Sequence, residues 1–415
     1  MGSPLLSFDE ASARVRVYAE ALLGGPAPKT ERVSLGQAQG RILAEPLVAD
    51  RDQPSFPRAT RDGFAVRAKE ASSNRPLTIA GAIRAGDPPA GPLLPGTAWE
   101  IMTGAAVPEG ADAVVMIEHV EVASGTVRLL PPRTIEPDEN FVPRGAEARA
   151  GDTILAPGVA LTAASIALAA FSGFAELDVY RRPRVAILCT GDEIVPVDES
   201  PKPGQIRNSN GPMLAALVAQ AGGEPWLLPT VADTEVALNV AIAQALEADL
   251  VLATGGVSAG KYDLVEPALE RAGFTFHFTG VRIQPGKPTV LATLPVQNKN
   301  GTKCFFGLPG NPISSAATFL LFAAPVVAAL GGRSDMGPRF ATARLAKRAK
   351  HDPALTRFMP AHCTFGAANQ WPTVERLFWQ GSGDLATFAR SNCFLVLPEE
   401  QDVIEAGTEV RILLF

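Results

Sequence analysis

The feature that most limits the possible folds is an alternation of strand-like and helix-like segments that begins near residue 181. Buried-strand patterns such as RVAILC (184–189) and LVLAT (250–254) alternate with helical stretches such as DTEVALNVAIAQALE (233–247), for which Asp233 is the expected N-cap. Such alternation favours an open, mostly parallel sheet with helices on both faces. We therefore expect a three-layer α/β/α unit over residues 181–332, with ligands beyond the carboxyl ends of the strands.

The rest of the chain divides into regions with other patterns. Residues 1–48 and 150–180 carry helical apolar stripes and together predict a helical N-terminal domain. Residues 49–149 are dense in Gly and Pro with short strand patterns, which predicts a β-rich domain inserted into the helical one. Residues 333–415 show short strands joined by turns and predict a compact C-terminal β domain.

Composition excludes several classes of protein. The net charge of −6 and the 7% aromatic content give no basic surface for nucleic acid. The amino terminus lacks the charged and apolar regions of a signal peptide. The apolar run 316–330 is short for a membrane span and contains Pro325, so we expect a buried helix there. The four cysteines lie far apart, which favours core packing over a zinc site. We expect a cytoplasmic protein that binds neither nucleic acid nor membrane.

Three loops at strand ends have the composition of an anion site. They are TGDE (190–193), TGGVSAGKYD (254–263) and LPGNPISS (308–315). Glycines let backbone N–H groups approach an oxyanion, and the PGNP loop leads into a helix whose first N–H groups favour an anion. The residues expected in this cradle are Gly255, Gly256, Ser258, Gly260, Pro309, Gly310, Asn311 and Pro312, with Lys287 as a positive charge.

Acidic residues in the same region point to a metal ion. Asp192, Glu193, Asp233 and Asp263 would repel one another and a bound phosphate. A divalent cation removes this repulsion, and oxygen ligands favour Mg²⁺. The loops therefore indicate a metal-assisted reaction on a phosphate-bearing substrate. The plainer interpretations are that Gly-Gly is an ordinary turn, Asp233 a helix cap and Lys287 a solvated charge.

The motifs TGDE, GGVSAGKYD and PGNP, in this order, resemble the molybdenum-cofactor biosynthesis domain. Further motifs extend the resemblance along nearly the whole chain: DGFAV (62–66), IMTGAAVPEGADAVV (101–115), FVPRGAEARAGD (141–152), GQIRNSN (204–210), QPGKP (284–288) and SNCFLVLPEE (391–400). Together they are similar to the molybdopterin molybdenumtransferase family, of the MoeA or gephyrin E-domain type.

The resemblance implies a four-domain, elongated homodimer with a small C-terminal β-barrel. It implies insertion of molybdenum from molybdate into adenylylated molybdopterin, with Mg²⁺-dependent release of AMP. The active site would lie between the α/β domain of one subunit and the inserted domain of the other, so that Asp62 faces Asp263. Molybdopterin adenylyltransferase and cofactor-accepting enzymes are further implied partners.

The resemblance also implies roles for individual residues. The acids carried over as catalytic and metal-binding are Asp62, Glu193, Asp233 and Asp263, with Glu147 as a further catalytic acid. Beyond the cradle, the implied substrate contacts are Thr190, Gly191, Asp192, Asn208, Ser209, Asn210, Ser314, Arg357 and Ser382.

Some positions depart from the family pattern. Arg61 stands where Met is usual, Glu147 where Asp is usual, Gln284 where Lys is usual and Leu355 where Arg is usual. Lys261 stands where relatives often carry an acid. Arg357 lies two residues after Leu355 and therefore on the same strand face, so Arg357 and Arg61 are candidates to restore the missing positive charge.

Two alternatives stay open from the sequence. The α/β domain alone fits an adenylyltransferase-like enzyme of nucleotides. The departures at Gln284 and Leu355 also fit a diverged paralogue that binds molybdopterin or partner proteins without turnover.

Overall fold

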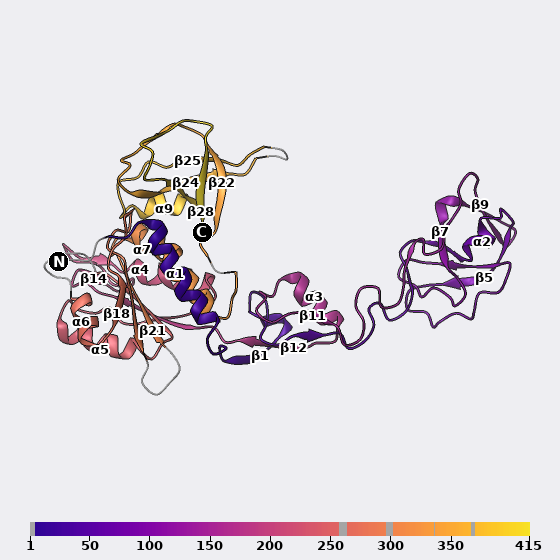
Figure 1. The fold of residues 1–415 in the computed structure, drawn as a ribbon, viewed down its shortest axis with the longest axis horizontal. Coiled ribbons are helices and arrows are strands. Elements are labelled where there is room, and N and C mark those ends of the chain that lie inside the picture. Colours follow the sequence, from indigo (N-terminus) through magenta and orange to yellow (C-terminus); the bar gives the residue numbers. More distant parts are fainter. Residues whose placement is uncertain (1–4, 257–263, 296–301, 336, 367–369) are drawn as a thin grey trace.

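The computed structural model describes residues 5–256, 264–295, 302–335, 337–366 and 370–415. Figure 1 shows an elongated molecule. The α/β unit and the C-terminal β domain lie at one end, the inserted β domain lies at the other, and a small unit that contains α3 joins them. The predicted multidomain α/β architecture is confirmed.

The α/β unit is built on a six-stranded sheet with the order β16-β13-β17-β21-β20-β18. The first four strands pair in parallel, whereas β20 and β18 are antiparallel to their neighbours. The antiparallel part arises because β20 and β21 follow each other without a crossover helix. The strands are β13 (Arg184–Cys189), β16 (Glu224–Leu227), β17 (Leu250–Thr254), β18 (Thr275–Phe278), β20 (Val290–Pro295) and β21 (Thr302–Leu308).

Helices cover both faces of this sheet. Side chains of β13 alternate between two cores, with Val185 and Ile187 in one and Ala186 and Leu188 in the other. α1, α4, α7 and α8 pack on the first face, and α5 and α6 on the second, which confirms the three-layer prediction. The helices are α1 (Phe8–Leu23), α4 (Asn210–Gln220), α5 (Glu235–Ala245), α6 (Val265–Arg271), α7 (Pro312–Thr318), the π-helix η3 (Phe319–Ala323) and α8 (Ala324–Leu330).

The first helix, α1, packs on the α/β unit and not on the N-terminal unit in which the sequence placed it. α1 begins with a capping box in which the Ser7 hydroxyl accepts the N–H of Glu10 and the Glu10 carboxylate accepts the N–H of Ser7. Its Phe8, Ala11 and Val15 belong to the core of the α/β unit and not to that of residues 150–180. The stripe of i, i+3 and i+7 positions on α1 covers a sheet face that would otherwise be exposed.

The rest of the expected helical domain contains more strand than predicted. β1 pairs with β12 and β2 with β11, both antiparallel, around Leu43, Leu161 and Leu177. These pairs join segments far apart in the sequence, so local periodicity gave little signal for them. The elements are β1 (Thr30–Ser34), η1 (Leu35–Gln37), β2 (Leu47–Val48), β11 (Thr153–Leu155), α3 (Ala163–Phe171) and β12 (Glu176–Tyr180).

The inserted domain has a six-stranded sheet with the order β7-β4-β6-β5-β9-β8 and a small β3–β10 pair. Its two connecting segments run side by side, and the N–H of Gln53 donates to the carbonyl of Ala148 at 2.7 Å. The elements are β3 (Arg58–Ala59), β4 (Gly63–Val66), α2 (Ala68–Ala71), β5 (Leu77–Ile83), β6 (Thr97–Ile101), β7 (Ala113–Met116), η2 (Ile117–His119), β8 (Val120–Ala123), β9 (Thr126–Leu129) and β10 (Phe141–Val142).

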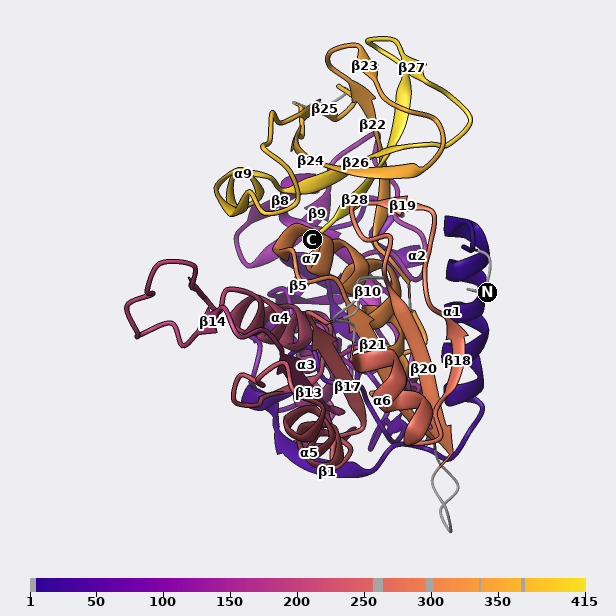
Figure 2. The same ribbon diagram turned by 90° about the vertical axis from the view of Figure 1, so that its left-hand side faces the viewer.

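The C-terminal domain is a closed barrel of five strands, β24-β25-β22-β28-β26, closed by the pairing of β26 with β24. β19 of the α/β unit adds to β24, and Figure 2 shows the barrel above that unit. The elements are β19 (Ile283–Gln284), β22 (Phe340–Leu345), β23 (Ala349–Lys350), β24 (Thr356–Thr364), β25 (Thr373–Arg376), α9 (Leu385–Arg390), β26 (Cys393–Leu397), β27 (Val403–Ile404) and β28 (Glu409–Leu414). A further short pair, β14 (Ile194–Val195) with β15 (Ile206–Arg207), projects from the α/β unit.

The apolar run near residue 320 belongs to a continuous helix that is longer than the sequence suggested. Pro312–Leu330 forms 19 helical residues, and this helix is the one stretch within the described ranges whose length and composition suit a membrane span. However, 83% of the most apolar 18-residue stretch of this helix is buried inside the protein. The prediction of a buried helix is thus confirmed, and the helix forms one wall of the α/β core.

Candidate active site

Three parallel strands of the α/β sheet end side by side. Cys189 is the register partner of Thr254, and Thr254 is the partner of Leu308. The loops that follow β13, β17 and β21 therefore leave the same edge of the sheet. The N–H of Thr190 also donates to the carbonyl of Thr254 at 3.0 Å. The structure thus brings together the starts of the three loops that the sequence predicted to meet.

Glycines allow these loops to approach one another closely. Gly255 has a φ of 91°, and a side chain there would collide with the carbonyl oxygen of Thr190. A Cβ on Gly310 would lie 3.6 Å from the Cα of Gly255. At Gly191, with a φ of 148°, a Cβ would lie 2.6 Å from Oε2 of Glu193. Gly255 is therefore required by its close contact with the first loop, whereas the distance at Gly310 is an ordinary van der Waals contact and the obstacle at Gly191 is the flexible side chain of Glu193 in its own loop.

Three carboxylates gather beside the first loop. The N–H of Asp233 donates to Oδ1 of Asp192 at 3.1 Å. Burial raises the pKa of Asp233, and the negative charges of Asp192 and Glu193 raise it further. The sequence expectation that Asp233 caps α5 is wrong, because the cap is the hydroxyl of Thr234, which accepts the N–H of Ala237. The carboxylate of Asp233 is consequently left available to a ligand.

The charge of this cluster fits a divalent cation, although one chain supplies an incomplete ligand set. Within the described ranges no group of three or more His, Cys, Asp and Glu side chains is close enough to hold a metal ion. Mg²⁺ commonly takes one or two protein carboxylates and completes its shell with water and substrate phosphate. Asp233 and Glu193 are carboxylates of the kind that this pattern uses, and burial, with the charges of Asp192 and Glu193 as smaller causes, raises the pKa of Asp233.

Two buried polar atoms near these loops lack a hydrogen-bond partner. They are Oγ1 of Thr190 and Oδ1 of Asn210. Thr190 also lines a cavity of about 10 Å³ together with Asp233 and Gly256, which has room for one group the size of a water molecule. A buried polar atom without a partner is costly, and these two could accept or donate to a group bound beside the loops.

The GQIRNSN segment lies at the start of α4. Oδ1 of Asn208 accepts the N–H of Gly211 at 2.9 Å, which fixes the first turn of the helix. Ser209 precedes α4 without capping it through its side chain. Of the three predicted contacts in this segment, Asn210 makes the hydrogen bonds that reach the strand-end loops.

The PGNP loop also contacts the C-terminal barrel domain. Pro312 occupies the first turn of α7, and Asn311 precedes the helix. The N–H of Ile313 donates to the carbonyl of Ser382 at 3.0 Å. The predicted contact Ser382 is therefore next to the loop, whereas Ser314 is buried.

The QPGKP segment lies between α7 and the barrel. A Cβ on Gly286 would collide with the methyl group of Thr318, and Gln284 pairs in register with Arg357 of β24. Lys287 is exposed and forms no ion pair with any described residue. The Arg357 guanidinium has Nε buried without a partner, and its nearest carboxylate, Asp352, is 3.8 Å away.

The inserted domain, which carries Asp62, lies at the other end of the molecule from the α/β unit (Figure 1). Oδ1 of Asp62 accepts the hydroxyl and the N–H of Thr103, each at 2.7 Å, and these bonds lower the pKa of Asp62. Glu147 pairs with Arg58 at 2.9 Å. The inserted domain thus presents Asp62 as an exposed, firmly oriented carboxylate.

Several predicted site residues lie outside the described ranges. They are Ser258, Gly260 and Asp263, together with the departure at Lys261. Their roles stay as the sequence predicted them.

Sequence reasoning missed residues that hold the site together. Thr103 orients Asp62, and Thr254 and Ser315 form hydrogen bonds between the strand-end loops. A signal existed for Thr254, because it is the polar last residue of the otherwise apolar strand LVLAT. A buried hydroxyl in such a strand needs a partner.

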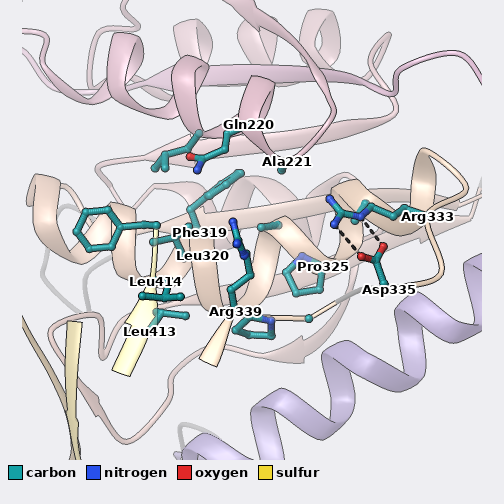
Figure 3. A pocket seen from close by; sticks show the side chains of 16 residues that line it. Gln220, Ala221, Phe319, Leu320, Pro325, Arg333, Asp335, Arg339, Leu413 and Leu414 are labelled. Carbon is teal, nitrogen blue, oxygen red and sulfur yellow. Dashed lines mark hydrogen bonds and ion pairs between the residues drawn. The ribbon is translucent and has the colours of Figure 1, made fainter. Parts of the chain in front are cut away.

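The cavity drawn in Figure 3 is separate from these loops. It has a volume of about 220 Å³ and lies between α4, η3, α8 and β28. Arg339 points into it, and the Arg333–Asp335 ion pair lies at its side. None of the predicted site residues lines this cavity. The candidate site therefore lies at the strand-end edge of the sheet and not in this cavity.

Comparison with known families decides the class of the chain. Residues 6–173 match the MoeA N-terminal region (domains I and II). Residues 186–329 match a probable molybdopterin binding domain, and residues 342–415 match the MoeA C-terminal region (domain IV). The chain belongs to the MoeA family. The N-terminal family region includes α1, which packs on the α/β unit.

Curated relatives match over most of their length. A protein named molybdopterin molybdenumtransferase from Nostoc sp. is 37% identical over 92% of this chain and 88% of the relative. One of the same name from Haemophilus influenzae is 34% identical over 92% of this chain and 93% of the relative. A MoeA crystal structure from Pyrococcus horikoshii is 30% identical, with a TM-score of 0.74 over 99% of each chain.

Proposed function

We propose that this MoeA-family protein is a molybdopterin molybdenumtransferase, which inserts molybdenum from molybdate into adenylylated molybdopterin and releases AMP. The observation that carries the proposal is the convergence of the TGDE, Gly255 and PGNP loops with Asp192, Glu193 and Asp233 at one sheet edge. This edge places N–H groups suited to phosphate beside carboxylates suited to a cation. The curated relatives with this name support the same reaction.

Each part of the edge has a distinct role in this proposal. The N–H groups at Gly255 and Gly256 orient the substrate phosphates. Asp233 and Glu193 would hold Mg²⁺, and a bound Mg²⁺ would supply positive charge to offset the negative charge of the substrate phosphates. Lys287, Arg357 and Ser382 bind the molybdate oxyanion beside the barrel. Asp263 completes the metal site, as the family resemblance implies.

A homodimer with shared sites explains the distance of Asp62 from the other acids. In this arrangement the partner subunit's Asp62 reaches the sheet edge and closes it. The inserted domain suits this role because it extends away from its own α/β unit. We further propose a cytoplasmic location, with molybdopterin adenylyltransferase as supplier of substrate and cofactor-dependent enzymes as acceptors.

The direct test is AMP release from adenylylated molybdopterin by the full-length protein. We expect release to require molybdate and Mg²⁺ together. Release that is independent of molybdate would instead assign a nucleotide-cleaving activity. Tight binding of substrate without turnover, unchanged by Gln284→Lys, would assign a binding or scaffolding role.

The shared site is tested by mixing two inactive variants, Asp62→Asn and Asp233→Asn. In mixed dimers one of the two sites carries neither substitution, so random exchange should restore roughly a quarter of wild-type activity. The molar mass of the same samples, measured by light scattering, shows whether the protein is a dimer. If the subunits exchange and activity does not recover, the shared site is wrong: either both residues act in the site of one subunit, or one of them does not take part in the reaction.

A further inference from the structure

Thr254 is a buried residue at the meeting point of the candidate loops. It ends β17, and 1% of its surface is exposed. Its carbonyl accepts the N–H of Thr190 at 3.0 Å. Its Oγ1 lies 2.9 Å from Nδ2 of Asn210 and 3.1 Å from the carbonyl oxygen of Pro309. One residue therefore contacts the TGDE loop, the PGNP loop and the first residue of α4.

A second hydroxyl strengthens the connection to the PGNP loop. Oγ of Ser315 lies 3.0 Å from Oγ1 of Thr254, and it donates to the carbonyl of Pro309 at 2.6 Å. Both hydroxyls thus converge on the same carbonyl oxygen. Thr254 and Ser315 are nearly inaccessible to solvent, so water would not replace these bonds if a hydroxyl were removed.

The same contacts fix the orientation of Asn210. Its Nδ2 donates to Thr254 and to the carbonyl of Gly310 at 2.7 Å, so both amide hydrogens are committed. A flipped amide would set its oxygen against the Gly310 carbonyl, which cannot donate. The unpartnered Oδ1 is therefore held as an acceptor beside the loops.

We propose that Thr254 is a positioning residue, whose hydroxyl and carbonyl set the relative placement of the TGDE loop, the PGNP loop and Asn210, with Ser315 in support. The consequence for catalysis rests on the proposed function, because those loops are the ones assigned to the substrate phosphates. Loops that shift by a fraction of an ångström lose alignment with the reacting group and so lose rate.

The test compares hydroxyl removal at two buried strand positions. Thr254→Val keeps the shape of the side chain and removes its hydrogen bonds, and Thr254→Ser restores the hydroxyl. The matched control is Thr293→Val on β20. Thr293 is also buried, and its hydroxyl contacts His277 at 2.9 Å. Thr293 pairs with Cys304, which lies near the start of β21, whereas the PGNP loop follows Leu308 at the other end of that strand.

Two readouts separate positioning from general stability. In hydrogen exchange, Thr254→Val should speed exchange of the amides in 190–194 and 313–316 at least tenfold, and Thr293→Val should leave them unchanged. In AMP release, Thr254→Val should lower kcat/KM at least tenfold, and Thr254→Ser should recover it to within threefold. Equal effects of the two valine variants on these amides and on kcat/KM would overturn the proposal.

The exchange measurement also keeps this inference separate from the proposed function. If the wild-type protein released no AMP, the proposed reaction would fail and exchange alone would decide the role of Thr254. Unchanged exchange in 190–194 and 313–316 would then overturn the proposal.

Discussion

Arg357 stands directly beside Gln284, because the two are register partners where β24 pairs in parallel with β19. The Nε atom of Arg357 is buried without a partner, and its nearest carboxylate is 3.8 Å away. The guanidinium therefore retains capacity to bind an anion. Gln284 occupies a position where the family motif usually has Lys, and we expect Arg357 to supply the missing positive charge.

We predict that Arg357→Gln weakens molybdate binding about tenfold, because a charge-assisted bond from a partly buried guanidinium is lost. Adding Gln284→Lys to this variant should restore most of the affinity. Isothermal titration with molybdate measures both changes.

A matched control for this prediction is Arg348→Gln. Arg348 lies on the barrel too, but its guanidinium is exposed and paired with Glu405 at 3.1 Å. Its loss should leave molybdate binding unchanged. A comparable loss in both variants would show that the overall charge of the barrel, and not Arg357, governs binding.

The bonds from Thr103 predict a pH effect at Asp62. The hydroxyl and the N–H of Thr103 lower the pKa of Asp62, so the carboxylate stays ionised to lower pH. Thr103→Val removes the hydroxyl and should raise this pKa toward its ordinary value. The acidic limb of the rate profile should then move to higher pH, and Thr103→Ser should reverse the shift. A carboxyl resonance of Asp62 that titrates identically in wild type and Thr103→Val would contradict this prediction.

The acid cluster predicts a pH-dependent stability. The pKa of Asp233 is raised in the folded state, so its ionisation costs stability: the cost begins as the pH rises through the ordinary pKa of the unfolded chain and is complete above the raised folded pKa. Asp233→Asn should therefore unfold at a higher temperature than wild type at pH 7 without divalent cations, and the difference should vanish below about pH 4. Mg²⁺ should stabilise wild type more than the variant. Calorimetry in which Asp233→Asn is less stable at pH 7 would argue against repulsion in this cluster.

The position of α1 predicts a large stability effect from a residue near the amino terminus. Phe8 is buried and packs edge-on against Phe358, with ring centroids 5.3 Å apart. Phe8→Ala should lower the free energy of unfolding by about 3–5 kcal/mol in denaturant titrations. Phe378→Ala should change it by less than about 0.5 kcal/mol, because that ring is exposed. A small effect at Phe8 would mean that α1 is dispensable to the α/β core.

The strand-end loops were predictable from local signals. The buried runs of β13 and β17 end at Cys189 and Thr254, and strand–helix alternation implies that parallel strands end at one edge. Local signals failed at the cap of α5, by one residue, and at contacts between distant segments. Asp233 resembled a helix cap, yet Thr234 fills that role and leaves the carboxylate among other acids. Thr254 gave little sign of its contacts with Asn210 and Pro309, because those partners lie far away along the chain.

The sequence by itself determined the α/β unit, its three loops and the residue types at their ends, because periodicity and turn chemistry act over a few neighbouring residues. Only the tertiary structure decided that α1 covers the sheet, that Arg357 lies beside Gln284 and that Asp62 stands apart from Asp233 within one chain. These relationships depend on which apolar faces and strand edges pair in space. The apolar surface that stabilises these contacts is buried between segments far apart in the chain, so no short stretch of sequence predicts it.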